Sequence, residues 1–440
     1  MPKTDDQALQ IARQVVAALN NTDYDTVYAL FNDAVANALS KDQLKASWES
    51  LLDAEGAYVG ETSHTTSTVQ DNKVVSLTLD FANATTTATI PIDGQGKLAG
   101  LNFRPTPKFD LAPDEQEITF KNGDDTIYGT LLIPTNAKGK VPGVVLISGS
   151  GPTDRDGNST LLAGKTDSHK LFARILANAG IASLRYDKYT TGKTGFSSLA
   201  GKLNTLTFSL YVDTAVSGYR YLASRIEVDA AHMAILGHSE GGLIALLAAM
   251  QLEKTPQPPV GLILVAPLSK PYMVTIREQI AAQYTAAVKA GSFAQQQADD
   301  GMAELDRIIA QVIKDATIPD RINPAFAQLF NPINLKFLQD VSQYNPVKIA
   351  AALPPTLKTL ILCGEKDFQV PCADVQLLAD GFKAGGNTTA QFNQLTNVDH
   401  VFKEINGEPN PATDYTDPTK PFSVEATTLI TAFVKTALLP

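Results

Sequence analysis

Apolar residues recur every three to four positions through the first fifty residues, as on one face of a helix. This spacing predicts helices over residues 7–20, 24–31 and 41–52. From Gly56 the pattern changes to alternating threonine and valine, which predicts strands. The expected strands cover residues 62–70, 73–81, 85–90 and 98–103. Helices followed by an antiparallel sheet indicate a small α+β domain over residues 1–104.

A proline-rich stretch, residues 105–114, is predicted to be a linker, with Pro105, Pro107 and Pro113 as its markers. Beyond it, residues 116–133 form a predicted hairpin around Asn122-Gly123. Buried strands then alternate with helices. The strands are expected over residues 144–148, 181–187, 232–237, 260–266, 356–363 and 388–395. This alternation predicts an α/β domain over residues 115–440, with a mostly parallel sheet flanked by helices.

One segment interrupts the alternation. About ninety residues separate the strand ending at Ala266 from the next one, far more than an ordinary connection. Helical spacing continues through residues 274–289 and 302–313, so we expect a helical lid at about residues 268–352. Apolar lid residues such as Tyr284 and Phe330 are expected to border the substrate pocket and to set the preferred acyl length.

Composition narrows the class of protein. Of the 440 residues, 44% are hydrophobic and 19% are charged, as in globular proteins. The net charge of −10 argues against nucleic acid or an anionic membrane as the main partner. No apolar run approaches the roughly 18 residues of a membrane span, and no secretory signal is recognisable, so a cytoplasmic protein is expected. Cys363 and Cys372 are expected to be reduced thiols, with a disulfide between them as the less favoured alternative, and no metal-ligand cluster accompanies them.

The strongest chemical motif is Gly237-His238-Ser239-Glu240-Gly241, between an apolar strand and an Ala/Leu-rich helix. This is the context of a nucleophile elbow, in which a serine occupies a sharp strand-to-helix turn. The flanking glycines fit such a turn because it leaves no room for a Cβ. Ser239 is therefore the candidate nucleophile.

A serine hydroxyl needs a base, and the base needs an acid that orients it. The five histidines are His64, His169, His232, His238 and His400. His64 lies in the small domain and His169 in a helix. His232 lies at the buried start of the elbow strand, and His238 lies in the elbow itself. His400 follows the last strand, where the order Ser–Asp–His places the base.

The acid is sought after the strand Leu360–Cys363, in Gly364-Glu365-Lys366-Asp367. Asp367 is favoured because Gly364 lets the chain bend and Asp367 lies well inside the loop. Glu365 remains the alternative. Asp399, directly before the base, is expected to face solvent.

Backbone N–H groups must also stabilise the developing oxyanion. The expected donors are Glu240, after the nucleophile, and Ser150 in the glycine-rich loop 149–157, with Gly151 as a further candidate. The spacing of that loop fits neither a dinucleotide fingerprint nor a phosphate-binding loop. It also lacks the glycine and glutamate of a calcium loop. No cofactor and no metal are expected.

Residues 115–440 resemble α/β-hydrolases of the bacterial carboxylesterase kind, near the dienelactone-hydrolase and prolyl-oligopeptidase branches. The resemblance rests on residues 146–151, 185–188, 237–241, 364–367 and 399–400. Ser148 stands where the family usually has histidine, and residues 189–192 depart from its Arg-Gly-x-Gly. The small domain resembles cystatin-like or nuclear-transport-factor-like folds. The resemblance implies ester hydrolysis through an acyl-enzyme without a cofactor.

The sequence thus predicts a serine esterase acting on small or medium acyl esters, with Ser239, His400 and Asp367 as its triad. Two alternatives stay open. The same groups could serve an aminopeptidase-like or thioesterase activity, or the chain could be a binding protein on an inactive hydrolase scaffold. The expected partner is a small-molecule ester, and a homodimer is left open.

Overall fold

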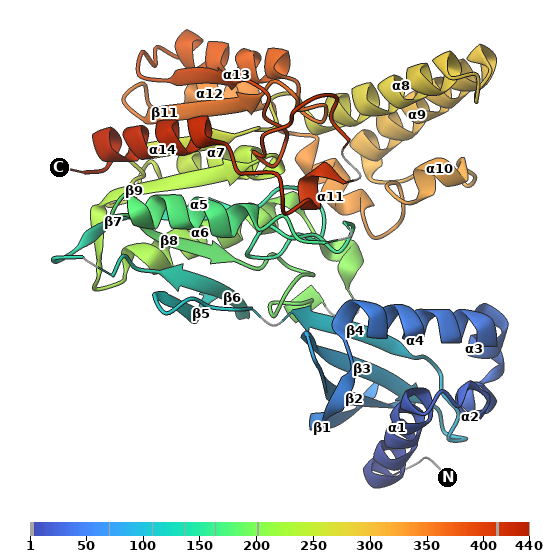
Figure 1. The fold of residues 1–440 in the computed structure, drawn as a ribbon. Coiled ribbons are helices and arrows are strands. Elements are labelled where there is room, and N and C mark those ends of the chain that lie inside the picture. Colours follow the sequence, from blue (N-terminus) through green and yellow to red (C-terminus); the bar gives the residue numbers. More distant parts are fainter. Residues whose placement is uncertain are drawn as a thin grey trace. The chain divides into compact units, whose positions relative to one another are not determined.

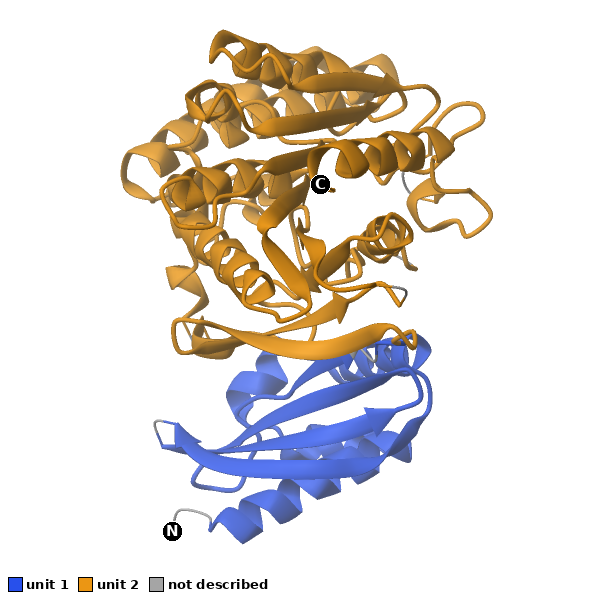
Figure 2. Cartoon of the chain, turned by 90° about the vertical axis from the view of Figure 1, so that its left-hand side faces the viewer, with its two compact units in different colours: residues 1–110 blue, residues 111–440 orange. Residues whose placement is uncertain are grey.

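The computed structural model describes residues 4–439, apart from residues 70, 108, 136, 163, 200, 201, 411 and 412. The chain divides into two compact units, Met1–Asp110 and Leu111–Pro440. Figure 2 colours the smaller unit blue and the larger one orange.

Helices packed on an antiparallel sheet make up the smaller unit (Figure 1). The elements are α1 (Asp5–Asn20), α2 (Tyr24–Leu30), α3 (Asp33–Ala38), α4 (Lys41–Glu55), β1 (Tyr58–Val69), β2 (Asn72–Phe81), β3 (Ala84–Ile92) and β4 (Asn102–Pro107). The sheet order is β1-β2-β3-β4. Thr4 and Ser40 begin α1 and α4 with reciprocal capping boxes, which satisfy backbone N–H groups at each helix start.

The core of the smaller unit follows from alternation along β2 and β3. Every second residue of β3 is buried, and the residues between them are half-buried. The buried face packs on α1 and α4, with Trp48 against Phe81 and Phe103. The expected α+β character is confirmed, but β4 extends to Pro107 and so includes the beginning of the predicted linker.

The larger unit is built on a sheet in the order β12-β11-β10-β9-β7-β8-β6-β5. Its strands are β5 (Glu115–Asn122), β6 (Asp125–Leu132), β7 (Val141–Ile147), β8 (Ala182–Tyr186), β9 (Val228–His238), β10 (Gly261–Val265), β11 (Lys358–Gly364) and β12 (Gln391–Leu395). Strands β5 and β6 form the expected hairpin, β6 pairs antiparallel with β8, and the remaining pairs are parallel. The predicted α/β-hydrolase fold is confirmed.

Two apolar cores lie on opposite faces of this sheet. One core contains side chains of α6 (Phe208–Ala223), α7 (Glu240–Leu252), α12 (Pro346–Ala352) and α13 (Cys372–Ala384). The other contains side chains of α5 (Ser168–Asn178) and α14 (Val424–Ala437). Because both faces are covered, the central strands are apolar on both sides, as parallel sheets require.

The long segment between β10 and β11 is helical, as its sequence predicts. It contains α8 (Tyr272–Lys289), α9 (Gln295–Asp315), α10 (Pro324–Ala327) and α11 (Leu335–Val341) before α12. Figure 1 shows α8 and α9 projecting as a hairpin. These helices enclose their own core of Met273, Leu305, Ile308, Val312, Phe326, Phe330 and Leu338.

The expected role of Phe330 needs correction. Phe330 is 1% exposed inside the core of the insertion, so it does not border a pocket. Tyr284 packs partly buried against the same core and contacts Phe293 at a ring-centroid distance of 5.6 Å. Among the described residues, none of the helices combines the length and apolar character needed to cross a bilayer.

Candidate active site

Ser239 occupies the turn between β9 and α7, with φ 56° and ψ −122°. A non-glycine residue adopts such a positive φ only where its surroundings enforce it. The neighbouring glycines show the crowding. A Cβ at Gly237 would lie 2.3 Å from the Gly241 carbonyl oxygen, and one at Gly241 would lie 2.3 Å from that of Ile147. The turn therefore admits only glycine at these two positions, as expected for a nucleophile elbow.

His400 and Asp367 lie together, although 33 positions separate them in the chain. Nδ1 of His400 donates to Oδ2 of Asp367 at 2.7 Å. The other carboxylate oxygen accepts the backbone N–H groups of Gln369 at 2.8 Å and Val370 at 2.9 Å. Both side chains are almost fully buried. These bonds hold the carboxylate in a single orientation toward the imidazole.

Gly364 allows the two loops to approach each other. A Cβ at this position would lie 2.2 Å from the carbonyl oxygen of Val398. The next residues join the loops, since the N–H of Lys366 donates to that same oxygen at 2.8 Å. The bend expected at Gly364 is thus a close contact between the loop after β11 and the loop after β12.

His238 ties the His400 loop to the elbow. Its Nε2 lies 2.9 Å from the backbone oxygen of His400, and the two imidazole rings are 4.9 Å apart. Because a carbonyl only accepts, Nε2 of His238 must carry the hydrogen. Burial, reinforced by the nearby His400 and His169, lowers the pKa of His238 well below its usual value. His238 is therefore a neutral positioning residue beside Ser239.

Two opposing effects act on the pKa of His400. Burial lowers it, while the charge and hydrogen bond of Asp367 raise it, and the net result is a pKa above the usual histidine value. An imidazole in this setting readily accepts a proton and is stabilised as imidazolium.

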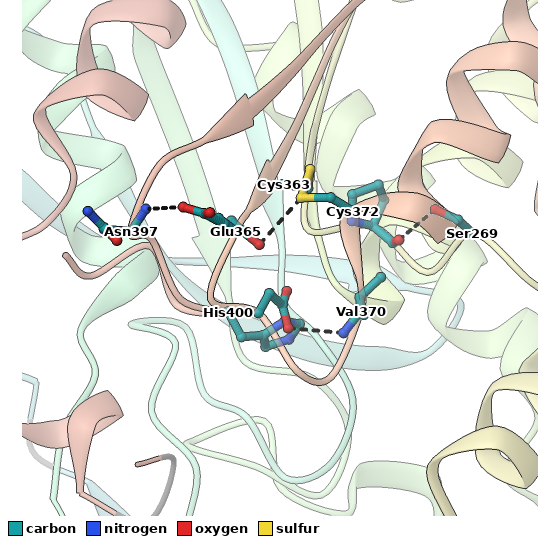
Figure 3. The surroundings of a disulfide bond; sticks show 10 residues. Ser269, Cys363, Glu365, Val370, Cys372, Asn397 and His400 are labelled. Carbon is teal, nitrogen blue, oxygen red and sulfur yellow. Dashed lines mark hydrogen bonds and ion pairs between the residues drawn. A yellow bond between two sulfur atoms is a disulfide. The ribbon is translucent and has the colours of Figure 1, made fainter. Parts of the chain in front are cut away.

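Glu365, the alternative acid, has another partner. Its carboxylate accepts the backbone N–H of Asn397 at 3.1 Å, on the approach to the His400 loop (Figure 3). Of the two candidate acids, only Asp367 is bonded to the imidazole among the described contacts.

Asp399 does not face solvent, contrary to expectation. It is 1% exposed, and one carboxylate oxygen accepts the N–H groups of Val401 at 3.0 Å and Lys403 at 2.8 Å. Burial raises the pKa of Asp399 to about 6. The side chain closes the turn that presents His400. An aspartate that caps N–H groups two and four positions ahead is a recognisable local signal.

Cys363 and Cys372 form a disulfide, which corrects the expectation of free thiols. Cys363 is the next-to-last residue of β11 and Cys372 begins α13. The intervening loop brings their Cα atoms to 5.4 Å, within bridging range. Figure 3 shows the bridge beside His400 and Val370. It closes the loop that carries Asp367.

The glycine-rich loop after β7 lies against the elbow. A Cβ on Gly149 would be 3.0 Å from the Cβ of Ser239 and 3.5 Å from its Oγ. The next carbonyl, that of Ser150, accepts the Thr153 hydroxyl at 3.0 Å. The two expected oxyanion donors, Ser150 and Glu240, therefore belong to segments that both adjoin Ser239.

Buried charged side chains contact the glycine-rich loop after β7 and stabilise it. Arg155 makes a bidentate pair with Asp187 at 3.1 and 2.6 Å, and both side chains are fully buried. Lys188, which was not singled out as a site residue, donates to the backbone oxygen of Gly149. Lys188 belongs to the matched motif 185–188, but its partners lie far away in the sequence, so the motif does not show what its side chain contacts. In the described part of the chain, no group of three or more histidine, cysteine, aspartate or glutamate side chains could hold a metal ion.

Comparison with known proteins agrees with this architecture. Residues 163–396, more than half of the chain, match the family described as serine aminopeptidase, S33. Residues 12–101 match a family of proteins of unknown function, DUF3887. The chain is 25% identical over 371 residues to Esterase EstD of Thermotoga maritima, covering 82% of this chain and 80% of that protein.

Solved structures with a similar fold include an esterase of Pyrococcus furiosus, with 12% identity, a TM-score of 0.45 and coverage of 76% of this chain and 97% of that one. Another is dienelactone hydrolase of Anabaena variabilis, with 15% identity, a TM-score of 0.40 and coverage of 74% and 99%. The family match and the sheet architecture together lead to one assignment: the chain belongs to the α/β-hydrolase family described as serine aminopeptidase, S33.

Proposed function

We propose that this protein is a serine esterase that cleaves carboxylic esters of small to medium acyl groups through an acyl-enzyme. Ser239 is the nucleophile, His400 the general base and Asp367 the group that orients the base. The N–H groups of Ser150 and Glu240 stabilise the oxyanion. The observation that carries the proposal is the 2.7 Å bond between His400 and Asp367, in a loop that His238 ties to the elbow.

The chemistry follows from these positions. The hydroxyl oxygen of Ser239 attacks the ester carbonyl while its proton passes to Nε2 of His400, and the carbonyl oxygen becomes an oxyanion. When the tetrahedral adduct collapses, His400 returns the proton to the departing alcohol. Water then repeats the sequence on the acyl-enzyme and releases the carboxylic acid. Asp367 keeps the hydrogen of the neutral imidazole on Nδ1, so that Nε2 is free to accept.

The similarity to Esterase EstD supports ester cleavage. The description of the matched family favours a second candidate, an aminopeptidase-like activity with the same groups. An aminopeptidase must hold the amine of its substrate with acidic side chains. The buried acid nearest to the nucleophile in sequence, Glu240, lies beside Lys188 and Tyr272, and this favours the esterase.

Three measurements test the proposal: fluorophosphonate labelling, ester hydrolysis and amide hydrolysis. Wild type should be labelled once by a fluorophosphonate at Ser239 and should hydrolyse p-nitrophenyl acetate and butyrate. Ser239→Ala should fold normally, escape labelling and lose several orders of magnitude in rate. Amino-acid p-nitroanilides distinguish the candidates, since faster cleavage of these amides would make the protein an aminopeptidase. A wild-type enzyme that is not labelled would overturn both.

The disulfide bears on the cellular compartment in which the protein is located. Structural disulfides persist in oxidising surroundings and are rare in the cytosol. We therefore infer an oxidising compartment instead of the cytoplasm expected above. Alkylation of protein taken from its native cells, before and after reduction, should find Cys363 and Cys372 protected only before reduction. Free thiols in the untreated protein would contradict this inference.

A further inference from the structure

The mechanism above leaves one buried ion pair without a role. Lys188 and Glu240 have side chains only 2% and 3% exposed, and Nζ of Lys188 lies 3.9 Å from Oε1 of Glu240. Burying two charges is unfavourable unless each finds compensating partners. Nζ of Lys188 also lies 5.1 Å from the centroid of the Tyr211 ring, within range of a cation–π contact. Tyr272, the first residue of α8, lies beside the Glu240 carboxylate and opposes the rise in its pKa that burial causes.

Both charged residues touch the segments that carry the proposed oxyanion donors. Lys188 donates to the carbonyl oxygen of Gly149. The peptide between Gly149 and Ser150 is trans, so its carbonyl and the N–H of Ser150 point in opposite directions. A hydrogen bond that fixes the Gly149 carbonyl therefore fixes the direction of the Ser150 N–H. Glu240 supplies the other donor from its own backbone, at the start of α7.

We propose that Lys188 and Glu240 are a positioning pair for the oxyanion hole, in which Lys188 orients the Ser150 N–H through the Gly149 carbonyl and Glu240 holds Lys188 against the elbow helix. The inference rests on the proposed function. It explains why a costly buried charge pair stands beside the nucleophile. The pair fixes two donors that are 90 positions apart in the chain, one in a loop and one at the start of α7, relative to each other. Neither side chain touches the substrate in this role.

The central test replaces Lys188 and reads out transition-state stabilisation. Removing an oxyanion donor lowers kcat about 100- to 1000-fold in a serine protease, and a misdirected donor should lose less. Lys188→Met should therefore lower kcat about 10- to 100-fold on p-nitrophenyl butyrate and leave KM within about twofold. Lys193→Met is the matched control because Lys193 lies on the same connection but pairs with the half-exposed Glu117, and it should keep the wild-type kcat.

A trifluoromethyl ketone gives an independent readout. Ser239 adds to its carbonyl carbon, the proton moves to His400, and the oxygen becomes an oxyanion that resembles the tetrahedral intermediate. Lys188→Met should weaken this inhibitor by about the same factor by which it lowers kcat. An unchanged kcat, or a loss confined to KM with unchanged inhibitor affinity, would overturn the inference.

The double variant Lys188→Met/Glu240→Gln separates positioning from stability. Lys188→Met alone leaves Glu240 buried without its cation, whereas the double variant removes both charges and should melt closer to wild type. Its kcat should nevertheless stay low, because the Gly149 carbonyl still lacks its donor. Recovery of kcat along with stability would show that the pair is only structural. If wild-type Ser239 failed to react with a fluorophosphonate, the proposed function would be refuted. If the wild type were labelled normally and Lys188→Met kept the wild-type kcat, only this inference would be refuted.

Discussion

The carboxylate of Asp367 accepts a hydrogen bond from Nδ1 of His400 at 2.7 Å, while two backbone N–H groups hold its other oxygen. Asp367 therefore has no freedom to rotate away from the imidazole. Glu365, two positions earlier, instead holds the backbone of Asn397. This difference makes the two acids a matched pair for mutagenesis.

Asp367→Asn should lower kcat on the order of a thousandfold or more, because an amide N–H facing Nδ1 favours the wrong imidazole tautomer. Glu365→Gln should remain within about tenfold of wild type, because it alters only the support of the His400 loop. Steady-state kinetics on p-nitrophenyl butyrate measures both. The reverse ranking would transfer the role of the acid to Glu365.

The pH dependence of kcat/KM should rise with the deprotonation of His400, since only the neutral imidazole accepts a proton. Asp367 holds the pKa of His400 above its usual value despite burial, so the midpoint should lie above about 6.5. In Asp367→Asn the charge is lost and the burial remains, so the midpoint should move to lower pH. Profiles from pH 5 to 9 test this, and a flat wild-type profile would exclude a histidine base.

Removing the disulfide should destabilise the larger unit. The bridge closes a short loop, with a sequence separation of 9, and chain entropy assigns such a bridge about 2–3 kcal/mol. Replacing both cysteines with alanine should lower the free energy of unfolding by about that amount. Dithiothreitol should lower the Tm of wild type but not that of the variant. An equal response of the two proteins would argue against the bridge.

Phe330→Ala should act on stability. The ring is 1% exposed in the core of the insertion, and deleting such a ring costs about 3–5 kcal/mol. Phe293, 41% exposed between α8 and α9, is the control, and its alanine variant should change stability by less than about 0.5 kcal/mol. Thermal denaturation compares them. Equal Tm values would show that Phe330 is not a core residue in solution.

The larger unit should keep the reactive serine without the smaller one. Each unit has its own apolar core, and all five proposed site residues lie in Leu111–Pro440. A fragment of residues 111–440 should therefore react with a fluorophosphonate at a rate near that of the whole chain. A folded fragment that resists labelling would show that the smaller unit contributes to the site.

The three residues of the proposed triad could be put forward from the sequence because their signals are local or depend on chain order. The elbow needs a glycine two positions before and two positions after Ser239. The base and the acid each follow a strand that the sequence predicts. The disulfide could not be found this way, because it depends on how the loop after β11 returns to α13. The role of Lys188 could not be found because its bond to Gly149 spans 39 positions. Only a folded chain shows such a contact.

Helices α8 to α11 form one continuous insertion between β10 and α12. Strands β10 and β11 are direct parallel neighbours, and α12 between them packs against α7 and α13, as an ordinary crossover helix does. Helices α8 to α11, which have a core of their own, are therefore inserted in this connection directly after the carboxyl end of β10. Such an insertion can be exchanged, lengthened or trimmed in a designed chimera without changing the strand order, if the chimera keeps Tyr272 beside Glu240 and Val341 in the main core.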